Sequence, residues 1–244
     1  MITSFIQGGL GNQLFQIAAG VALAKKIGSE FCLHDGQHHL PLQGSRIETY
    51  KDNILKNIQF KDLGHVTFVP YRYDAPSYLP ITEVDNQALI GYFQSEKYFK
   101  EHGDLIRELF YLPRVPTPEG SVSIHVRRGD YLKNPDIHPA LDASYYREAL
   151  EVVGDYSKVY VFTDSDLPEG LELDNMEIVS PGKDYEHLAL MASCNHNIIA
   201  NSTYSWWAAY LNTNNNKVIA PKTWFGPKGP QAWDDIYCEG WIKI

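Results

Sequence analysis

The chain has 244 residues, of which 44% are hydrophobic and 21% charged, a composition typical of one large or two small globular domains. Its net charge of −9 argues against nucleic acid or an anionic membrane surface as a partner, because both attract positive proteins. The three cysteines, Cys32, Cys194 and Cys238, are widely separated, which argues against a disulfide framework or a cysteine zinc site and fits a reducing compartment.

The beginning of the chain lacks the pattern of a signal peptide. The longest apolar stretch, residues 17–24, is too short for a bilayer span, which takes about 20 residues. We therefore expect no transmembrane segment and a cytoplasmic location, and leave open a peripheral association with the inner membrane.

The first half is expected to open with strand, glycine turn, helix and strand, an order typical of a parallel sheet. Apolar residues recur at helical spacing between 12 and 28, and Gly28 stands where a helix would end. The other predictions are strands at 2–6 and 30–34, short elements and loops over the proline-broken residues 35–90, and a helix over 95–109.

Residues 113–120, with the sequence PRVPTPEG, predict a linker because proline and glycine interrupt regular structure. We accordingly predict an N-terminal α/β domain over 1–112 and a C-terminal Rossmann-like domain over 121–244.

The second half alternates strand-like and helix-like segments, which predicts an open, doubly wound sheet. Ligands of such sheets bind beyond the carboxyl ends of the strands. The predicted strands are 121–126, 158–163, 176–180, 196–200 and 217–220, and the predicted helices are 144–153, 185–193 and 203–211.

The glycine-rich turn GGLGNQ, from Gly8, connects a predicted strand to a predicted helix. Its backbone can approach a ligand, and the start of a helix favours negative charge. It matches a dinucleotide fingerprint only in part, because Leu14 replaces the third glycine, and it lacks the lysine of a phosphate-binding loop. A tight turn before a helix is the alternative interpretation.

The motif HVRRGDY follows the strand at 121–126. His125 and Arg127 are expected on the same side of the strand, since side chains alternate. Two adjacent arginines favour an anionic ligand, for which guanidinium is well suited. The alternative is a surface ion pair between Arg128 and Asp130.

The motif NSTYSWW follows a predicted buried strand and begins a helix. Asn201 or Ser202 is suited to cap that helix, and the N–H groups there suit a phosphate. Of Trp206 and Trp207, one is expected in the core and the other at the border of the site, because neighbours cannot share one helix face. The glycosylation sequon at Asn201 is discounted because no secretory signal precedes it.

Asp164 follows the strand at 158–163 and could accept hydrogen bonds from a guanine edge or a ribose. With Asp166 it forms an Asp-x-Asp pattern, whose carboxylates could instead hold Mg²⁺ or Mn²⁺.

Together GGLGNQLFQ, HVRRGDY, VFTDS and NSTYSWWAAYL resemble, in order and spacing, the bacterial α-1,2-fucosyltransferases of glycosyltransferase family 11. The HxRRxD pattern also resembles α-1,6- and protein O-fucosyltransferases, so the linkage is inferred from NSTYSWW and GGLGNQ. Ile17 departs from the resemblance, since relatives often carry an aromatic residue there.

The resemblance implies an α/β, GT-B-like fold in which two Rossmann-type domains face a central cleft. It also implies an inverting transfer of L-fucose from GDP-fucose to a galactose-terminated glycan acceptor, with neither a metal nor a cofactor. The implied donor-binding residues are Gly11, Asn12, Arg127, Asp164, Asn201, Ser202 and Thr203. Arg127 is the main pyrophosphate ligand among them, with support from His125.

The acceptor hydroxyl has to lose its proton during the transfer. Asp130 is one candidate base, but a carboxylate beside two arginines has a lowered pKa and could instead orient Arg128. His125 is another candidate, and a late transfer without a dedicated base is a third possibility. The alternatives for the whole chain are another linkage, a GDP-mannose-type donor, an inert GDP-sugar-binding protein or a metal-dependent enzyme.

Overall fold

The computed structural model describes residues 1–36, 45–214 and 217–244, which form two compact units. The first unit comprises Met1–Tyr111 and Ala232–Cys238, and the second comprises Leu112–Gln231 and Glu239–Ile244.

The segment Ala232–Cys238 lies in the first unit, whereas the sequence analysis assigned residues 121–244 entirely to the second domain. Asp235 is the reason: its carboxylate accepts a hydrogen bond from Tyr78 N at 2.7 Å, and its carbonyl accepts one from Ser95 Oγ at 2.6 Å. These contacts join residues far apart in the chain, which local sequence patterns do not report.

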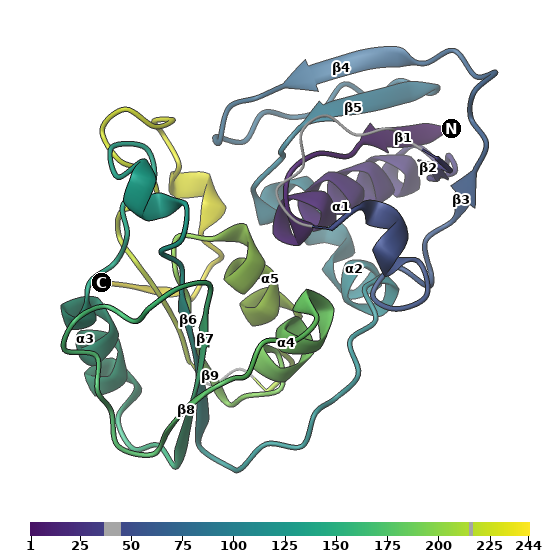
Figure 1. The fold of residues 1–244 in the computed structure, drawn as a ribbon. Helices are drawn as coiled ribbons and strands as arrows, with labels where there is room; N and C mark the ends of the chain where they lie inside the picture. Colours follow the sequence, from purple (N-terminus) through teal and green to yellow (C-terminus); the bar gives the residue numbers. More distant parts are fainter. Residues whose placement is uncertain (37–44, 215–216) are drawn as a thin grey trace. The chain divides into compact units, whose positions relative to one another are not determined.

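The first unit contains a three-stranded parallel sheet in the order β1 (Ile2–Phe5), β5 (Gln87–Gly91), β4 (Val69–Tyr73). Figure 1 shows these strands stacked on the helix α1 (Leu10–Lys26). The strand expected at 30–34 is reduced to β2 (Leu33–His34), which pairs with β3 (Phe60–Lys61).

Helix α1 contains Gly20 because its neighbours leave no room for a side chain. A Cβ there would lie 2.4 Å from the Phe31 ring and 2.7 Å from Ser4 Oγ. The expected end of the helix is confirmed, since Gly28 follows it with a φ of +67°. No helix in the described parts of the chain is both long and apolar enough to cross a membrane.

The helix predicted over 95–109 is broken into pieces: the 3-10 turns η2 (Glu96–Tyr98) and η3 (Lys100–His102), then α2 (Gly103–Leu109). Phe99, between the turns, departs from helical geometry, with a φ of −139° and a ψ of 11°. This backbone places its ring in the core, where it is 1% exposed. A further 3-10 turn, η1 (Ile47–Tyr50), lies in the region expected to hold short elements.

The second unit is built on a six-stranded, wholly parallel sheet in the order β11-β10-β9-β6-β7-β8. Figure 1 shows α3 on one side of this sheet and α4 and α5 on the other, which confirms the predicted alternating α/β architecture. The elements are β6 (Ser121–Val126), α3 (Ala143–Val153), β7 (Lys158–Thr163), β8 (Met176–Ile178), α4 (Asp184–Met191), β9 (His196–Ile198), α5 (Thr203–Leu211), β10 (Lys217–Ala220) and β11 (Ile242–Lys243).

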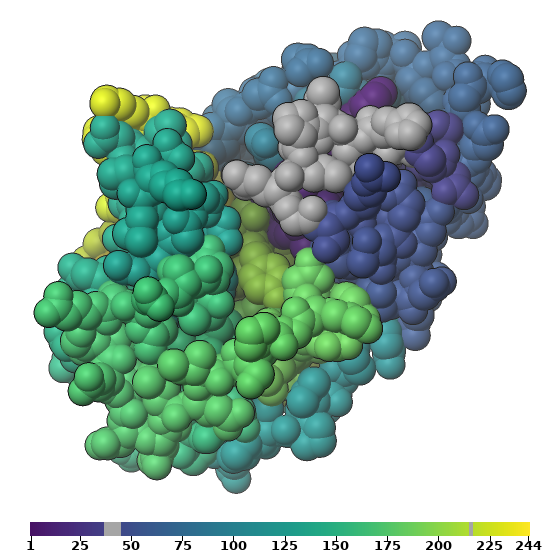
Figure 2. Space-filling model, viewed as in Figure 1, coloured from purple at the N-terminus to yellow at the C-terminus, as the bar shows by residue number. Residues whose placement is uncertain are grey.

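Two loops of this unit pack together beyond the sheet. Gly226 N donates to Ile137 O and Lys228 N to Asp136 O, both at 2.9 Å. Figure 2 shows the second unit's teal and green surface, to which these loops belong, in a space-filling view. Gly226 is required here, since a Cβ would lie 2.4 Å from Asp136 O.

Candidate active site

The candidate site lies at the switch point of the second unit's sheet, where the order in which the chain adds strands reverses. From β6 the chain moves outward through β7 and β8, then crosses to β9 on the other side of β6. The crevice beyond the carboxyl ends of two such strands is where open α/β sheets bind ligands. The predicted motifs HVRRGDY and NSTYSWW leave β6 and β9 at this point.

Arg127 lies between two carboxylates. Its Nη2 is 2.5 Å from Asp130 Oδ1, and its Nη1 is 2.5 Å from Asp164 Oδ2. The alternative of an Arg128–Asp130 ion pair is therefore wrong: the Arg128 guanidinium instead donates to Leu141 O at 3.4 Å. The chain turns after Arg127 into the 3-10 helix η4 (Tyr131–Lys133), and this turn brings Asp130 to Arg127.

Asp164 is fixed in place by backbone donors. Its Oδ1 accepts hydrogen bonds from Arg128 N at 2.9 Å and Gly129 N at 3.0 Å. Burial raises the pKa of this carboxyl, but the two N–H donors and then Arg127 outweigh that effect, so the pKa lies below its usual range. The guanine or ribose contact expected for Asp164 stays a prediction; in the structure its carboxylate holds the HVRRGDY loop.

His125 is buried beneath these charges, with 6% of its surface exposed. Its Nδ1 is 3.0 Å from Ser205 Oγ, and its ring meets that of Tyr204 edge-on at 5.5 Å. Burial, followed by the nearby Arg127, lowers the pKa of His125 to about 4. The imidazole is thus neutral at pH 7 and connects β6 to α5.

Asn201 is buried at 1% exposure, and its side chain joins two loops. Its Nδ2 donates to Pro139 O at 3.1 Å and to Trp224 O at 3.0 Å, while Tyr131 donates its hydroxyl proton to Asn201 O at 2.9 Å. These contacts favour a structural role for Asn201. Its contact with the donor stays a prediction.

Ser202 and Thr203 begin α5. Ser202 is the N-cap residue, yet its side chain makes no capping hydrogen bond. The first N–H groups of a helix have no partner within the helix, so this end suits an anion. The expectation that one of Trp206 and Trp207 borders the site is wrong, because both are 0% exposed.

The glycine-rich motif lies in the first unit. Gly8, rather than Gly11, has a positive φ, +77°, and a Cβ at Gly8 would lie 2.6 Å from Asn12 Nδ2. Gly11 lies in the first turn of α1, and Asn12 Oδ1 accepts a hydrogen bond from Gln94 Nε2 at 2.8 Å. The contacts of Gly11 and Asn12 with a donor stay predictions.

Two aromatic residues to which the sequence analysis assigned no role lie beside the charged cluster. Arg127 Cζ is 5.3 Å from the centroid of the Tyr131 ring, and the His138 ring stacks on Tyr131 at 4.8 Å. Tyr131 belongs to the motif HVRRGDY, which could have identified it. His138 lies in a loop without regular pattern, so no local signal marks it.

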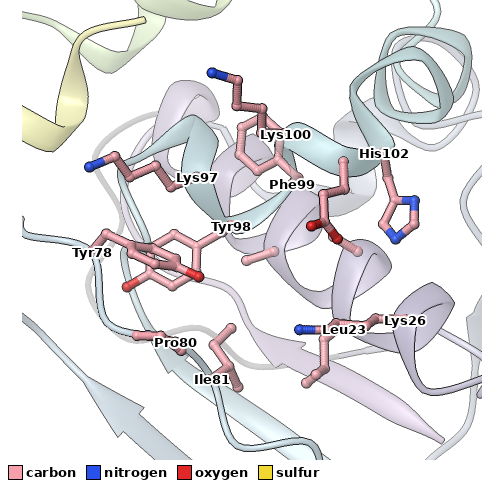
Figure 3. A pocket seen from close by; sticks show the side chains of 13 residues that line it. Leu23, Lys26, Tyr78, Pro80, Ile81, Lys97, Tyr98, Phe99, Lys100 and His102 are labelled. Carbon is pink, nitrogen blue, oxygen red and sulfur yellow. The ribbon is translucent and has the colours of Figure 1, made fainter.

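A cavity elsewhere, in the first unit, is lined by Tyr78, Tyr98 and Leu23 among others (Figure 3). Its three lysines are paired with carboxylates: Lys26 with Glu83 at 2.7 Å, Lys97 with Asp235, and Lys100 with Glu96 at 4.0 Å. The cavity thus offers mainly aromatic and aliphatic surface, so the charge chemistry suited to a diphosphate lies at the switch point of the second unit instead.

The described residues contain no group of three or more His, Cys, Asp or Glu side chains placed to hold a metal ion. Independence from metal stays a prediction that needs an activity measurement.

Comparison with known proteins tests the resemblance. An O-antigen biosynthesis glycosyltransferase of Escherichia coli, WbnK, is 27% identical, with 99% of each chain covered. An α-1,2-colitosyltransferase of the same species is also 27% identical, over 100% of this chain and 99% of the relative. The solved fucosyltransferase NodZ from Bradyrhizobium shares the fold, with a TM-score of 0.52 at 12% identity, covering 95% of this chain and 96% of NodZ. The family model "Glycosyl transferase family 11" matches residues 1–244, so the chain belongs to glycosyltransferase family 11.

Proposed function

We propose that this chain is an inverting, metal-independent fucosyltransferase, which transfers L-fucose from GDP-β-L-fucose to a galactoside hydroxyl in α-1,2 linkage. The observation that carries the proposal is the guanidinium of Arg127, held between two carboxylates at the switch point of a family 11 chain. The name of one Escherichia coli relative, an O-antigen biosynthesis glycosyltransferase, supports a role in O-antigen or other surface-glycan synthesis, which we propose takes place on the cytoplasmic side.

The proposed chemistry needs charge stabilisation more than acid catalysis. The acceptor oxygen attacks the anomeric carbon, the bond from that carbon to the β-phosphate oxygen breaks, and GDP leaves as a stable anion. Arg127 and the start of α5 at Ser202 and Thr203 are the donors proposed to face this developing charge. Loss of one such preorganised donor typically costs about 3–4 kcal/mol of transition-state stabilisation. The GT-B-like arrangement of the two domains stays a prediction.

The test is GDP release from GDP-fucose in excess EDTA, with and without lactose as a β-galactoside acceptor. Acceptor-dependent release is expected, together with a product whose NMR spectrum shows fucose on the galactose 2-hydroxyl. Release that requires added Mn²⁺ would refute the metal-independent mechanism and direct attention to Asp164 and Asp166. GDP binding without transfer to any galactoside would favour an inert binding protein.

A second donor is worth testing because one relative is named a colitosyltransferase. An activated colitose donor should be offered in parallel, and a higher kcat/KM with it would change the proposed sugar but not the proposed reaction class.

A further inference from the structure

We propose that the donor diphosphate displaces Asp130 from Arg127, and that the Asp130 carboxylate released in this way accepts the proton of the acceptor hydroxyl. This inference rests on the proposed function and assigns it a base and an order of events.

The charges at the switch point cancel before any ligand is bound. Arg127 and Arg128 contribute two positive charges, and Asp130 and Asp164 contribute two negative ones. Both terminal nitrogens of Arg127 face a carboxylate, at 2.5 Å in each case. A diphosphate is a strong anion that guanidinium binds through the same terminal N–H groups. A diphosphate that binds both terminal nitrogens of Arg127 therefore competes with the two carboxylates for them, and its negative charge repels them.

The two carboxylates are held unequally. Asp164 follows the buried strand β7, its side chain is 26% exposed, and backbone N–H groups of Arg128 and Gly129 also bind it. Asp130 stands before the short helix η4 and is the more exposed of the two, with a side chain 37% exposed. Displacement of Asp164 would break three contacts and free the loop itself. Asp130, rather than Asp164, is therefore the carboxylate that leaves Arg127 when the diphosphate binds.

Displacement changes what the Asp130 carboxylate contacts. In the ion pair its Oδ1 is occupied by the guanidinium of Arg127, whereas the displaced carboxylate can accept a hydrogen bond from an incoming hydroxyl. The carboxylate is thus available to the acceptor only when the donor diphosphate is bound.

The transfer needs no further reactant to take up the proton or the leaving group. The hydroxyl oxygen forms its bond to the anomeric carbon, its proton passes to Asp130, and the electron pair of the broken bond leaves on GDP. After GDP departs, Asp130 loses the proton to solvent and pairs with Arg127 again. His125 is excluded from this task because it is buried and bound to Ser205.

The test compares two isosteric variants of the full chain, Asp130→Asn and Asp164→Asn, by calorimetric titration with GDP and by turnover. Asp130→Asn removes the competitor of the diphosphate, so GDP should bind about five- to tenfold more tightly, while transfer slows on the order of 10²-fold or more. Asp164→Asn should weaken GDP binding, because it loosens the HVRRGDY loop.

Asp130→Ala serves as a second variant, because it also removes the carboxylate and should show the same tighter binding. Equal or weaker GDP binding by both Asp130 variants, with unfolding midpoints like that of the wild type, would overturn the inference while leaving the proposed function standing. A wild-type protein that binds no GDP would overturn the proposed function and the inference with it.

Discussion

Acidification is expected to destabilise the protein through one buried side chain, His125. Its imidazole is 6% exposed and neutral, and burial together with Arg127 lowers its pKa from 6.5 to about 4. In the unfolded chain the same imidazole takes up a proton near pH 6.5. Between these two pH values the unfolded state binds more protons than the folded state, so stability falls as the pH falls.

The size of the effect follows from the difference in pKa. Each pKa unit corresponds to about 1.4 kcal/mol, so the drop from 6.5 to about 4 amounts to roughly 3 kcal/mol once the pH lies below both values. About 2–3 kcal/mol of this loss should be present at about pH 4.5, and almost none at about pH 7.5. Domains of this kind are stable by only about 5–15 kcal/mol, so the loss is measurable.

The assay is urea unfolding of the wild type and of His125→Asn at about pH 7.5 and about pH 4.5. The wild type should lose about 2–3 kcal/mol more between these pH values than the variant does, because other titrating groups cancel in the comparison. Ser205→Ala is the control: it removes the hydrogen-bond partner but keeps the burial, so the wild-type pH dependence should persist. Equal pH dependence of the wild type and His125→Asn would refute the reasoning.

Three substitutions test other parts of the structure. Asn201→Asp keeps the shape but places a carboxylate against two backbone carbonyls at a site 1% exposed, so urea unfolding should show a loss of about 2–4 kcal/mol. Gly91→Ala should cost at least about 3 kcal/mol in the same assay, because Gly91 has a φ of +146° and a Cβ would lie 1.9 Å from Tyr73 O; an unchanged midpoint would refute this. Gly129→Ala places a Cβ 2.9 Å from Asp164 Oδ2, so it should weaken GDP binding roughly tenfold while the unfolding midpoint stays within about 1–2 °C of wild type.

Most of the second unit was predictable because its strands, apart from the two-residue β11 that was not predicted, are short runs that alternate with helices. The strands at 121–126, 158–163 and 217–220 have the predicted bounds, and the helix at 203–211 does too. In a doubly wound sheet the strand ends then indicate where a ligand binds, so the motifs after β6 and β9 could be placed at one edge without a structure.

The first unit was less predictable, for physical reasons. Its edge strand β4 has the sequence VPYRY and is largely exposed, so it lacks an apolar pattern and contains a proline. The central strand β5, with the sequence QALIG, is only five residues long and follows a polar stretch. Both strands are defined by their pairing across the sheet, which a local window of sequence does not contain.

Within the site, the sequence predicted the residue types but not the pairing. It could not indicate that Asp130 pairs with Arg127 rather than Arg128, because the choice depends on the turn into η4. Nor could it show that the Asn201 side chain faces Pro139 and Trp224, since both partners are backbone carbonyls in irregular loops.

The choice of donor sugar is a separate question from the binding of the diphosphate, because contacts to phosphate carry no information about the sugar. The colitosyltransferase relative is 27% identical to this chain, and the O-antigen relative at the same identity is named for no donor sugar, so sequence similarity does not decide between the sugars. Fucose and colitose differ by one hydroxyl group. A site that hydrogen-bonds this group rejects the deoxy sugar by about 10⁴-fold or more, whereas an apolar pocket separates the two by only about 10²-fold. The ratio of kcat/KM for the two donors therefore measures whether a polar side chain faces this hydroxyl. It does so independently of the Asp130 experiment, in which the binding measurement uses GDP without any sugar.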